Sequence, residues 1–413
     1  MVRQRGTAAS KHESREVDKN IEEEVKAKTA NKHLSRIPTK PGVSLRQRCF
    51  TFAKYALLLS ILPPFLNFAA LHKEGQQLKP QTGELYDIGF GQKMYLGCLG
   101  QGAPTVILDA PTGMSSDVWL QVQLKLAKFT KVCVYDRAGL GFSERPYRNE
   151  STQEGTDNDN PAQLFSKGSE RWQHYTVERM ADDLHRLVTG SSDQPRPFIL
   201  VGAEMGALVS RFYANMFQGE VSDLVLIEPL VETIFMEDDG IWTQFWFGHL
   251  IPWQQSLQLA AATGLTRFAL LLGLMEQPLA GANQTMEQIA RQKYLVCNPR
   301  HMSSVVDEHH FINESFSQIR TLSRLKQFPS NISVMVINGN YYDEQLPSGL
   351  NKAWAKSQQH LISQLHPQSQ HVLVNGGDHR MIYRMPQTIV EPIVRIIKKY
   401  RHNKRTTKDT KSS

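Results

Sequence analysis

Short apolar runs alternate with helix-like segments from about residue 84 onward. Residues 84–100 predict a first hairpin, with Gly89 and Gly91 at its turn. Six further apolar runs predict buried strands, at residues 104–110, 131–136, 197–203, 222–229, 333–339 and 371–377. Unbroken apolar strands separated by helical segments are typical of a parallel sheet that is covered on both faces. The pattern predicts one α/β domain over residues 84–400 with a mostly parallel central sheet.

Two segments interrupt this alternation. Residues 149–172 are polar and rich in turn-forming residues, which predicts an inserted surface loop. Residues 230–325 are mostly helical in pattern and lie between two predicted strands, so they predict a helical cap over one edge of the sheet. The simplest interpretation of the many aromatic and leucine residues in this cap is packing against the body. A lipid-facing or ligand-facing role is the alternative.

Ahead of the domain, residues 49–71 form an apolar run in which Lys54 is the single charged side chain. About 20 apolar residues suffice for a helix to cross a membrane. The run therefore predicts a transmembrane helix or anchor, kinked at Pro63 and Pro64. A re-entrant hairpin and an interfacial helix are the alternatives. A cleaved signal peptide is disfavoured because a long polar tail, residues 1–48, precedes the run.

The residues that flank the apolar run indicate an orientation. Arg46 and Arg48 precede it, and the positive-inside rule then favours a cytoplasmic N-terminus with a lumenal or extracellular body. Four glycosylation sequons in the body favour the same topology, at Asn149, Asn283, Asn313 and Asn331. We therefore expect a single-pass membrane glycoprotein. A cytosolic body remains the alternative, and the pattern does not indicate which membrane is used.

The net charge of +7 is carried by the two ends of the chain. Residues 1–48, predicted to be disordered, and a basic C-terminal tail at residues 401–413 hold most of the excess Lys and Arg. The body is left acidic, which argues against a nucleic-acid-binding face. No spacing resembles a metal site, and we expect no cofactor.

Four cysteines leave few pairings open. Cys49 lies in the membrane run and Cys133 in a buried-strand pattern. By this reasoning Cys98 and Cys297 are the one pair left for a disulfide, and the sequence does not show whether they meet.

Four segments resemble the α/β-hydrolase superfamily, in the family's order and spacing. Residues 109–116 (DAPTGMSS) are similar to the loop after the third strand, and residues 134–144 (VYDRAGLGFSE) to the next strand and its loop. Residues 198–214 (FILVGAEMGALVSRFYA) are similar to the nucleophile elbow and its helix. Residues 375–393 (NGGDHRMIYRMPQTIVEPI) resemble the loop that carries the catalytic histidine. The resemblance implies the α/β-hydrolase fold.

The elbow departs from the family at its central position. The usual G-x-S-x-G becomes Gly202-Ala203-Glu204-Met205-Gly206, so both glycines are kept while Glu204 replaces the nucleophilic serine. A serine hydrolase needs that hydroxyl oxygen to form its acyl intermediate. The resemblance therefore implies that the ordinary serine mechanism is missing.

The resemblance also places the remaining site residues. His379 matches the catalytic base, and Asp343 after the seventh strand matches the acid, with Glu228 after the sixth strand as the alternative. The oxyanion donors would be the backbone N–H groups of Met205 and Thr112. Pro111 stands where the family often has glycine and has no N–H to donate. Beside this, Asp136 and Arg137 are interpreted as a structural charge pair that ties adjacent loops together.

Two functions from different classes follow. The first is a membrane-tethered module without catalytic activity; its candidate partners are a lipid, a small hydrophobic ligand or a protein. The second is a hydrolase in which Glu204 is a carboxylate nucleophile and His379 activates water, as in relatives that open epoxides. A nucleophile elsewhere, such as Ser115 or Ser143, is a further alternative, although neither lies on an elbow. We expect the first.

Overall fold

The computed structural model describes residues 45–412, except residue 90, the segment 147–174 and short stretches at 192–193, 277–278, 280, 282–283, 341–342 and 344–345. The predicted insert 149–172 lies outside these residues, as do Asn149 and Asn283. Asn313 and Asn331 are described, and both are exposed. The chain forms two units, residues 1–60 and 61–413. Their boundary falls inside helix α2 (Leu45–Gln77).

An eight-stranded sheet forms the centre of the second unit, in the order β1-β2-β4-β3-β5-β6-β7-β8. The strands are β1 Gly83–Asp87, β2 Lys93–Leu99, β3 Thr105–Asp109, β4 Val132–Tyr135, β5 Phe198–Ala203, β6 Val221–Ile227, β7 Ser333–Gly339 and β8 Gln370–Val374. The first two strands form the predicted antiparallel hairpin, β2 also pairs antiparallel with β4, and every other pairing is parallel. The predicted strands are all present, and the predicted α/β fold is confirmed.

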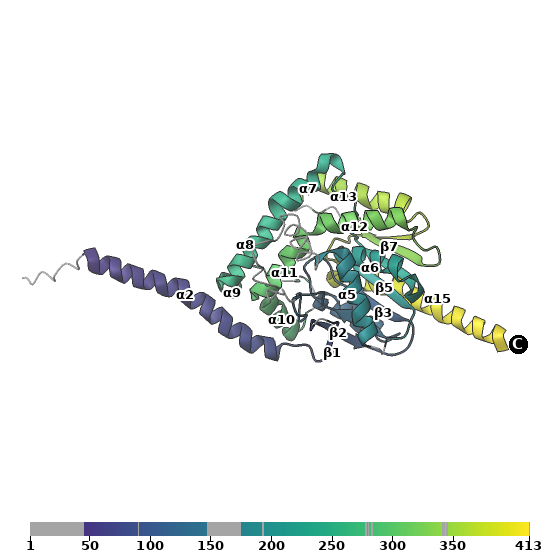
Figure 1. Ribbon diagram of the computed structural model, residues 1–413, viewed down its shortest axis with the longest axis horizontal. Coiled ribbons are helices and arrows are strands. Elements are labelled where there is room, and N and C mark those ends of the chain that lie inside the picture. The colour runs from purple at the N-terminus through teal and green to yellow at the C-terminus, as the bar shows by residue number, and fades with distance from the viewer. Residues whose placement is uncertain are drawn as a thin grey trace, which may run out of the picture. The chain divides into compact units, whose positions relative to one another are not determined.

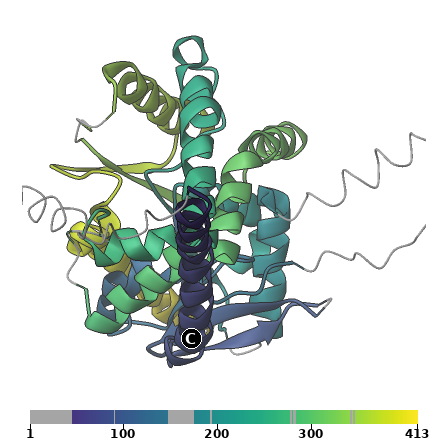
Figure 2. The ribbon, with the colours of Figure 1, turned by 90° about the vertical axis from the view of Figure 1, so that its left-hand side faces the viewer.

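Helices cover both faces of the sheet because successive strand residues point to opposite sides. In β3, Ile107 packs in one buried apolar cluster, while Val106 and Leu108 pack in the other. The first cluster includes residues of α5 (Val177–Gly190), α6 (Met205–Met216) and α12 (Ile312–Leu325), and the second includes residues of α3 (Leu120–Leu126) and α15 (Pro386–Ser412). Figures 1 and 2 show α5 and the yellow α15 on opposite sides of the sheet.

The region predicted to be a cap is helical. It contains α7 (Ile241–Phe245), α8 (Ile251–Ala262), α9 (Leu265–Leu271), α10 (Met286–Cys297), α11 (Pro299–His310) and α12. Two tryptophans hold it in place through their indole N–H groups. Trp242 donates to the carbonyl of Leu350 at 2.9 Å, and Trp246 donates to that of His309 at 2.8 Å. Packing within the cap and against the body therefore accounts for part of its aromatic content.

Helix α2 carries the apolar run. Among the described residues it is the one helix long and apolar enough to cross a membrane, with a mean hydropathy of 1.6 over its most apolar window. Pro63 and Pro64 lie inside it.

The disulfide joins Cys98 to Cys133, so Cys98 and Cys297, the one candidate pair that the sequence reasoning left open, do not pair. Cys98 on β2 and Cys133 on β4 are direct partners in the antiparallel register, with Cα atoms 4.0 Å apart. Cys297 is buried in α10 with a free thiol, and Cys49 is free and exposed. The apolar pattern around Cys133 correctly predicted a buried strand, but it did not show which strand lies beside it.

Counting thiols tests this pairing. We expect the chain isolated from its native source and denatured without reductant to expose two alkylatable thiols, Cys49 and Cys297, and four after reduction, by mass spectrometry. A Cys133→Ser variant serves as control and should show three without reductant. Four thiols in the unreduced wild type would contradict the disulfide and indicate a body held in a reducing compartment.

Candidate active site

The sharp turn predicted at the elbow is present. Strand β5 ends at Ala203 and α6 begins at Met205, so Glu204 alone joins them, with φ 46° and ψ −108°. A residue other than glycine in such a conformation costs on the order of 1–3 kcal/mol, which the surrounding packing must offset. The Glu204 N–H donates to the carbonyl of Ile227 at 3.1 Å and ties the turn to the neighbouring strand.

The two elbow glycines are required by close backbone approach. A Cβ atom on Gly202 would lie 2.2 Å from the carbonyl oxygen of Gly206, and one on Gly206 would lie 2.5 Å from that of Asp109. Real Cβ atoms essentially never come so close. The strand can therefore turn directly into the helix only with glycine at both positions, which explains why the pattern around Glu204 persists without the serine.

Glu204 is half-buried at the apex of this turn. Burial raises the pKa of its carboxyl group, and the neighbouring His379 and Thr112 oppose that shift. Glu228 adds a further, repulsive contribution that raises the pKa of Glu204. Met205 is the first residue of α6, and N–H groups in the first turn of a helix lack a partner within it. The two expected oxyanion donors, Thr112 and Met205, thus both lie next to Glu204.

His379 has Glu228 as a carboxylate partner. The Nδ1 atom of His379 lies 3.4 Å from Oε2 of Glu228, the residue that follows β6. Two donors fix that carboxylate: the N–H of Gly339 to Oε1 at 2.5 Å, and the indole N–H of Trp354 to Oε2 at 2.9 Å. The Trp354 ring also packs edge-on against the His379 ring, with centroids 4.8 Å apart. Burial raises the pKa of Glu228, and His379, Gly339 and Trp354 oppose that effect.

Asp343, the acid that the sequence favoured, lines a cavity at this site. This cavity has a volume of about 280 Å³ and is also lined by Glu228 and His379. The backbone N–H of Asp343 donates to Asn351 Oδ1 at 3.3 Å, and its carbonyl accepts from Asn351 Nδ2 at 2.9 Å. The geometry thus brings both candidate acids to one cavity and puts the alternative, Glu228, in contact with the imidazole. The catalytic roles of all these residues remain predictions.

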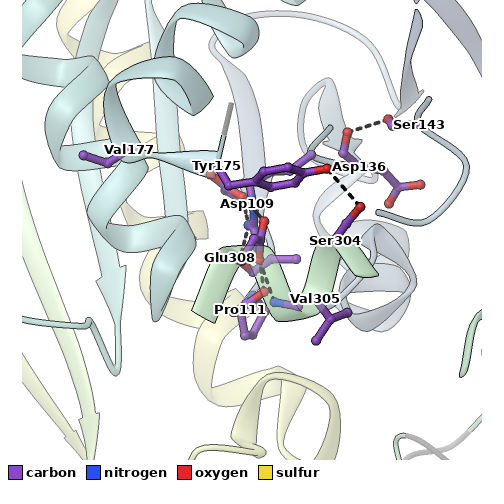
Figure 3. A network of polar contacts seen from close by, with 12 residues as sticks. Asp109, Pro111, Asp136, Ser143, Tyr175, Val177, Ser304, Val305 and Glu308 are labelled. Carbon is purple, nitrogen blue, oxygen red and sulfur yellow. Dashed lines mark hydrogen bonds and ion pairs between the residues drawn. The ribbon is translucent and has the colours of Figure 1, made fainter. Parts of the chain in front are cut away.

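Arg137 fixes the loop that carries Thr112. Its buried guanidinium donates to Asp109 Oδ1 at 2.6 Å and to both carboxylate oxygens of Glu308 at 2.7 and 2.9 Å. It also donates to the carbonyls of Ala110 at 2.6 Å and Pro111 at 2.8 Å. Figure 3 shows Glu308 reaching from α11 of the cap toward Asp109 and Pro111 at the end of β3. Although Pro111 has no N–H, its carbonyl therefore anchors the loop.

Glu308 also contacts the loop directly. Its Oε2 atom accepts the backbone N–H of Gly113 at 2.7 Å, one residue after Thr112. Burial raises the pKa of Asp109, against the opposing effect of Arg137 and of a 2.6 Å hydrogen bond from the Tyr135 hydroxyl. Arg137 donates to the carboxylates of both Asp109 and Glu308, and the Tyr135 hydroxyl donates to Asp109 as well. The buried carboxylates of this cluster therefore have hydrogen-bond partners.

Asp136 and Arg137 have separate structural roles in place of the predicted mutual pair. The Asp136 carboxylate accepts the N–H groups of Ser116 at 2.7 Å and Phe142 at 2.9 Å. The prediction that these residues tie loops together is supported, but the partners differ. Ser143, one of the alternative nucleophiles, donates its hydroxyl to the carbonyl of Asp136 at 2.6 Å.

Ser115, the other alternative nucleophile, accepts a hydrogen bond from Gln292 of α10 at 3.2 Å. The contacts of both serines are therefore structural ones. Among the described residues, no group of three or more His, Cys, Asp or Glu side chains is arranged to hold a metal ion.

Sequence reasoning missed two residues that shape the site. Glu308 lies in a cap helix, 171 positions from Arg137 along the chain. Trp354 lies in α13 (Ser348–His360), 126 positions from the Glu228 that it fixes. Glu308 lies in the polar run 307–310 (DEHH) at the end of α11, so the local sequence indicates neither its burial nor its partner.

Solved structures resemble this fold closely in extent and weakly in sequence. They include the Cif epoxide hydrolase from Acinetobacter nosocomialis (TM-score 0.56, 14% identity, 80% of this chain and 96% of that one). The epoxide hydrolase CorEH without ligand has a TM-score of 0.54 at 18% identity, over 76% of this chain and 97% of that one. Cfl2 from Burkholderia cenocepacia has a TM-score of 0.55 at 15% identity, over 77% and 98%. Identities this low show a shared fold and no more.

No curated protein matches the chain at the level of sequence. The sequence model of the alpha/beta hydrolase family matches residues 106–391, which is more than half of the chain. That stretch includes the elbow, the loop held by Arg137, the cap and the His379 loop. This protein therefore belongs to the alpha/beta hydrolase family.

Proposed function

We propose that this protein is a membrane-anchored member of the alpha/beta hydrolase family that lacks serine-hydrolase activity and uses its site to bind a ligand or a partner. The observation that carries the proposal is Glu204 at the apex of the elbow, at φ 46°. In this position the side chain faces the site, and glutamate has no hydroxyl group from which an acyl-enzyme could form. Ser115 and Ser143, the nearest alternatives, are engaged by other groups.

The electrostatics of the site favour binding over nucleophilic attack. Burial raises the pKa values of both Glu204 and Glu228, and in both cases the nearby His379 opposes that shift. A raised pKa disfavours the ionised form of Glu204, which is the form that would act as a nucleophile. Its side chain is also one methylene longer than the aspartate that carboxylate-based relatives use, and attack geometry is sensitive to shifts of that size. The site is therefore better suited to hold a polar group of a small hydrophobic ligand.

A second candidate function is supported by the contact between His379 and Glu228. In this alternative a Glu204 oxygen attacks an epoxide carbon, the ring C–O bond breaks, and the resulting alkoxide takes a proton. His379 then removes a proton from the water that hydrolyses the ester, and Glu228 stabilises the imidazolium. The 3.4 Å contact with Glu228, held in turn by Gly339 and Trp354, would suit this role.

The anchor and its topology belong to the same proposal. Helix α2 is long and apolar enough to cross a membrane, and the basic residues Arg46 and Arg48 favour a cytoplasmic N-terminus. The disulfide between Cys98 and Cys133 supports a lumenal or extracellular body because disulfides persist in oxidising compartments.

A serine-directed fluorophosphonate probe tests the central proposal. The wild type should stay unlabelled, whereas Glu204→Ser should gain labelling, because the new hydroxyl sits on an intact turn beside His379 and the Thr112 and Met205 donors. Adding His379→Ala should reduce the labelling rate by roughly 10³-fold or more. Gel fluorescence and peptide mass spectrometry provide the readout. Strong labelling of the wild type would refute the proposal by revealing a working serine elsewhere.

The same background identifies the acid. In the Glu204→Ser protein, we expect Glu228→Gln to lower the labelling rate by roughly 10²–10⁴-fold, because it removes the partner of His379. Asp343→Asn is the matched control and should have little effect. The reverse result would show that Asp343 is the acid, as the family pattern suggests.

An adduct experiment separates the two candidate functions. If Glu204 is a nucleophile, His379→Ala incubated with a small aryl epoxide should gain the full mass of the epoxide at Glu204, because the ester forms but cannot hydrolyse. The rate should rise with pH through the raised pKa of Glu204, since its ionised form attacks. Glu204→Gln should form no adduct. If neither an adduct nor wild-type turnover appears, the carboxylate mechanism is excluded for this substrate class.

Extraction and glycan analysis test the anchor. The full-length chain should remain in the membrane pellet after alkaline carbonate treatment. In a secretory host, glycosidase should lower its mass, and Asn331→Gln should reduce that shift because Asn331 is exposed. A chain that washes off at high pH would show peripheral attachment, and an unglycosylated chain would favour a cytosolic body.

A further inference from the structure

The tip of the cap, where α8 turns into α9, carries a single charged residue and exposes several large apolar side chains. Between residues 241 and 275, Arg267 is the one Lys, Arg, Asp or Glu. Large apolar side chains are nevertheless exposed around the turn, and we call them the tip surface: Leu259, Leu265, Phe268, Leu271 and Leu272, which are 37–75% exposed. Several large apolar side chains exposed on two successive helices indicate a contact with another molecule or with a membrane.

The tip packs against the C-terminal part of α2, within the same unit of the chain. Asn67 of α2 donates to the carbonyls of Ala261 at 2.9 Å and Cys297 at 3.0 Å. Arg267 donates to Asn67 at 2.9 Å and forms two 2.7 Å hydrogen bonds with Glu74 of α2. Figure 1 shows α9 and α10 beside this part of α2. The single charge of the tip is therefore already paired with a residue of the apolar helix.

The turn between α8 and α9 contacts α2 at Pro63. A Cβ atom on Gly264 would lie 2.5 Å from the carbonyl oxygen of Pro63, so the two backbones are in close contact there. Crossing the hydrocarbon takes about 20 helical residues. Counted from Arg48, the last charge before the run, about 20 residues end near residue 68. A crossing by α2 therefore includes Pro63 and Asn67, and places the turn at Gly264 at hydrocarbon depth.

We propose that the tip surface of the cap is immersed in one leaflet of the membrane, the leaflet from which α2 emerges toward the body. The protein then contacts the bilayer through the cap as well as through α2. This inference rests on the proposed membrane anchor. The surface faces the acyl chains of lipids, because the tip packs against the apolar helix and because its single charged residue, Arg267, is paired with Asn67 and Glu74.

Depth-dependent quenching tests the inference in the full chain. A Cys49→Ser background receives Leu265→Cys at the tip, and an environment-sensitive fluorophore is attached after reconstitution into phosphatidylcholine vesicles. Vesicles with doxyl-labelled phosphatidylcholine should strongly reduce its emission. Leu325→Cys is the matched control, since Leu325 is an exposed leucine at the end of α12. Its label should keep its emission. The Cys49→Ser background alone corrects for reaction at Cys297.

A third label at Phe52→Cys, inside α2, separates the inference from the anchor. Quenching at Phe52 without quenching at Leu265 would overturn the inference and leave the anchor standing. Absence of quenching at both would remove the anchor and the inference together. Equal quenching at Leu265 and Leu325 would also overturn the inference, because it would show unspecific adsorption or contacts between copies in place of an immersed tip.

Photolabelling of the unmodified chain supplies an independent readout. A lipid with a carbene-forming group in its acyl chain should modify the tryptic peptide that follows Arg267, which begins at Phe268 and carries Leu271 and Leu272. Peptides from the central sheet should remain unmodified. Adducts confined to α2 peptides would contradict immersion of the cap without involving any substitution.

Discussion

The buried guanidinium of Arg137 is the interaction on which the rest of the site depends. It joins three parts of the chain: the end of β3 through Asp109, the loop after β3 through the carbonyls of Ala110 and Pro111, and the cap through Glu308. A buried cation of this kind adds little net stability compared with apolar packing, but removing one partner of such a pair typically costs about 3–5 kcal/mol because a charge is left uncompensated. Its effect is to fix one arrangement of loop and cap.

The elbow keeps its shape with a different residue at its apex because the turn does not depend on the side chain there. The turn requires only Gly202 and Gly206 and the strand register that holds the Glu204 N–H against Ile227. Replacing a hydroxymethyl group with a longer carboxylate changes the chemistry without altering the backbone. A serine hydroxyl needs a base to become a nucleophile. The pKa of the Glu204 carboxyl depends instead on burial and Glu228, which raise it, and on His379, which lowers it.

The cap connects the site to the apolar helix. Helix α11 supplies Glu308 to the loop beside Glu204, while α8, α9 and α10 supply the groups that hold α2 through Asn67. These helices pack on one another within the second unit. At this junction Arg267 donates to the Asn67 amide and to the Glu74 carboxylate. These polar side chains are partly buried, and burial is tolerated because their donors and acceptors are paired. The contacts with α2 and the geometry of the site therefore depend on the same group of helices.

The sequence alone determined the features that depend on local pattern. Short apolar runs predicted every strand of the sheet. The resemblance of residues 202–206 to the nucleophile elbow of the family predicted the turn and showed that Glu204 replaces the usual hydroxyl. Tertiary structure decided the pairings. Cys98 lies opposite Cys133 because β2 and β4 are neighbours in register. Glu228 contacts His379 because β6 and β8, the strands that precede them, flank β7 in parallel and end at the same edge of the sheet. Arg137 forms an ion pair with Glu308 because α11 of the cap packs over the end of β3. Such contacts depend on how distant segments pack, and local composition does not record them.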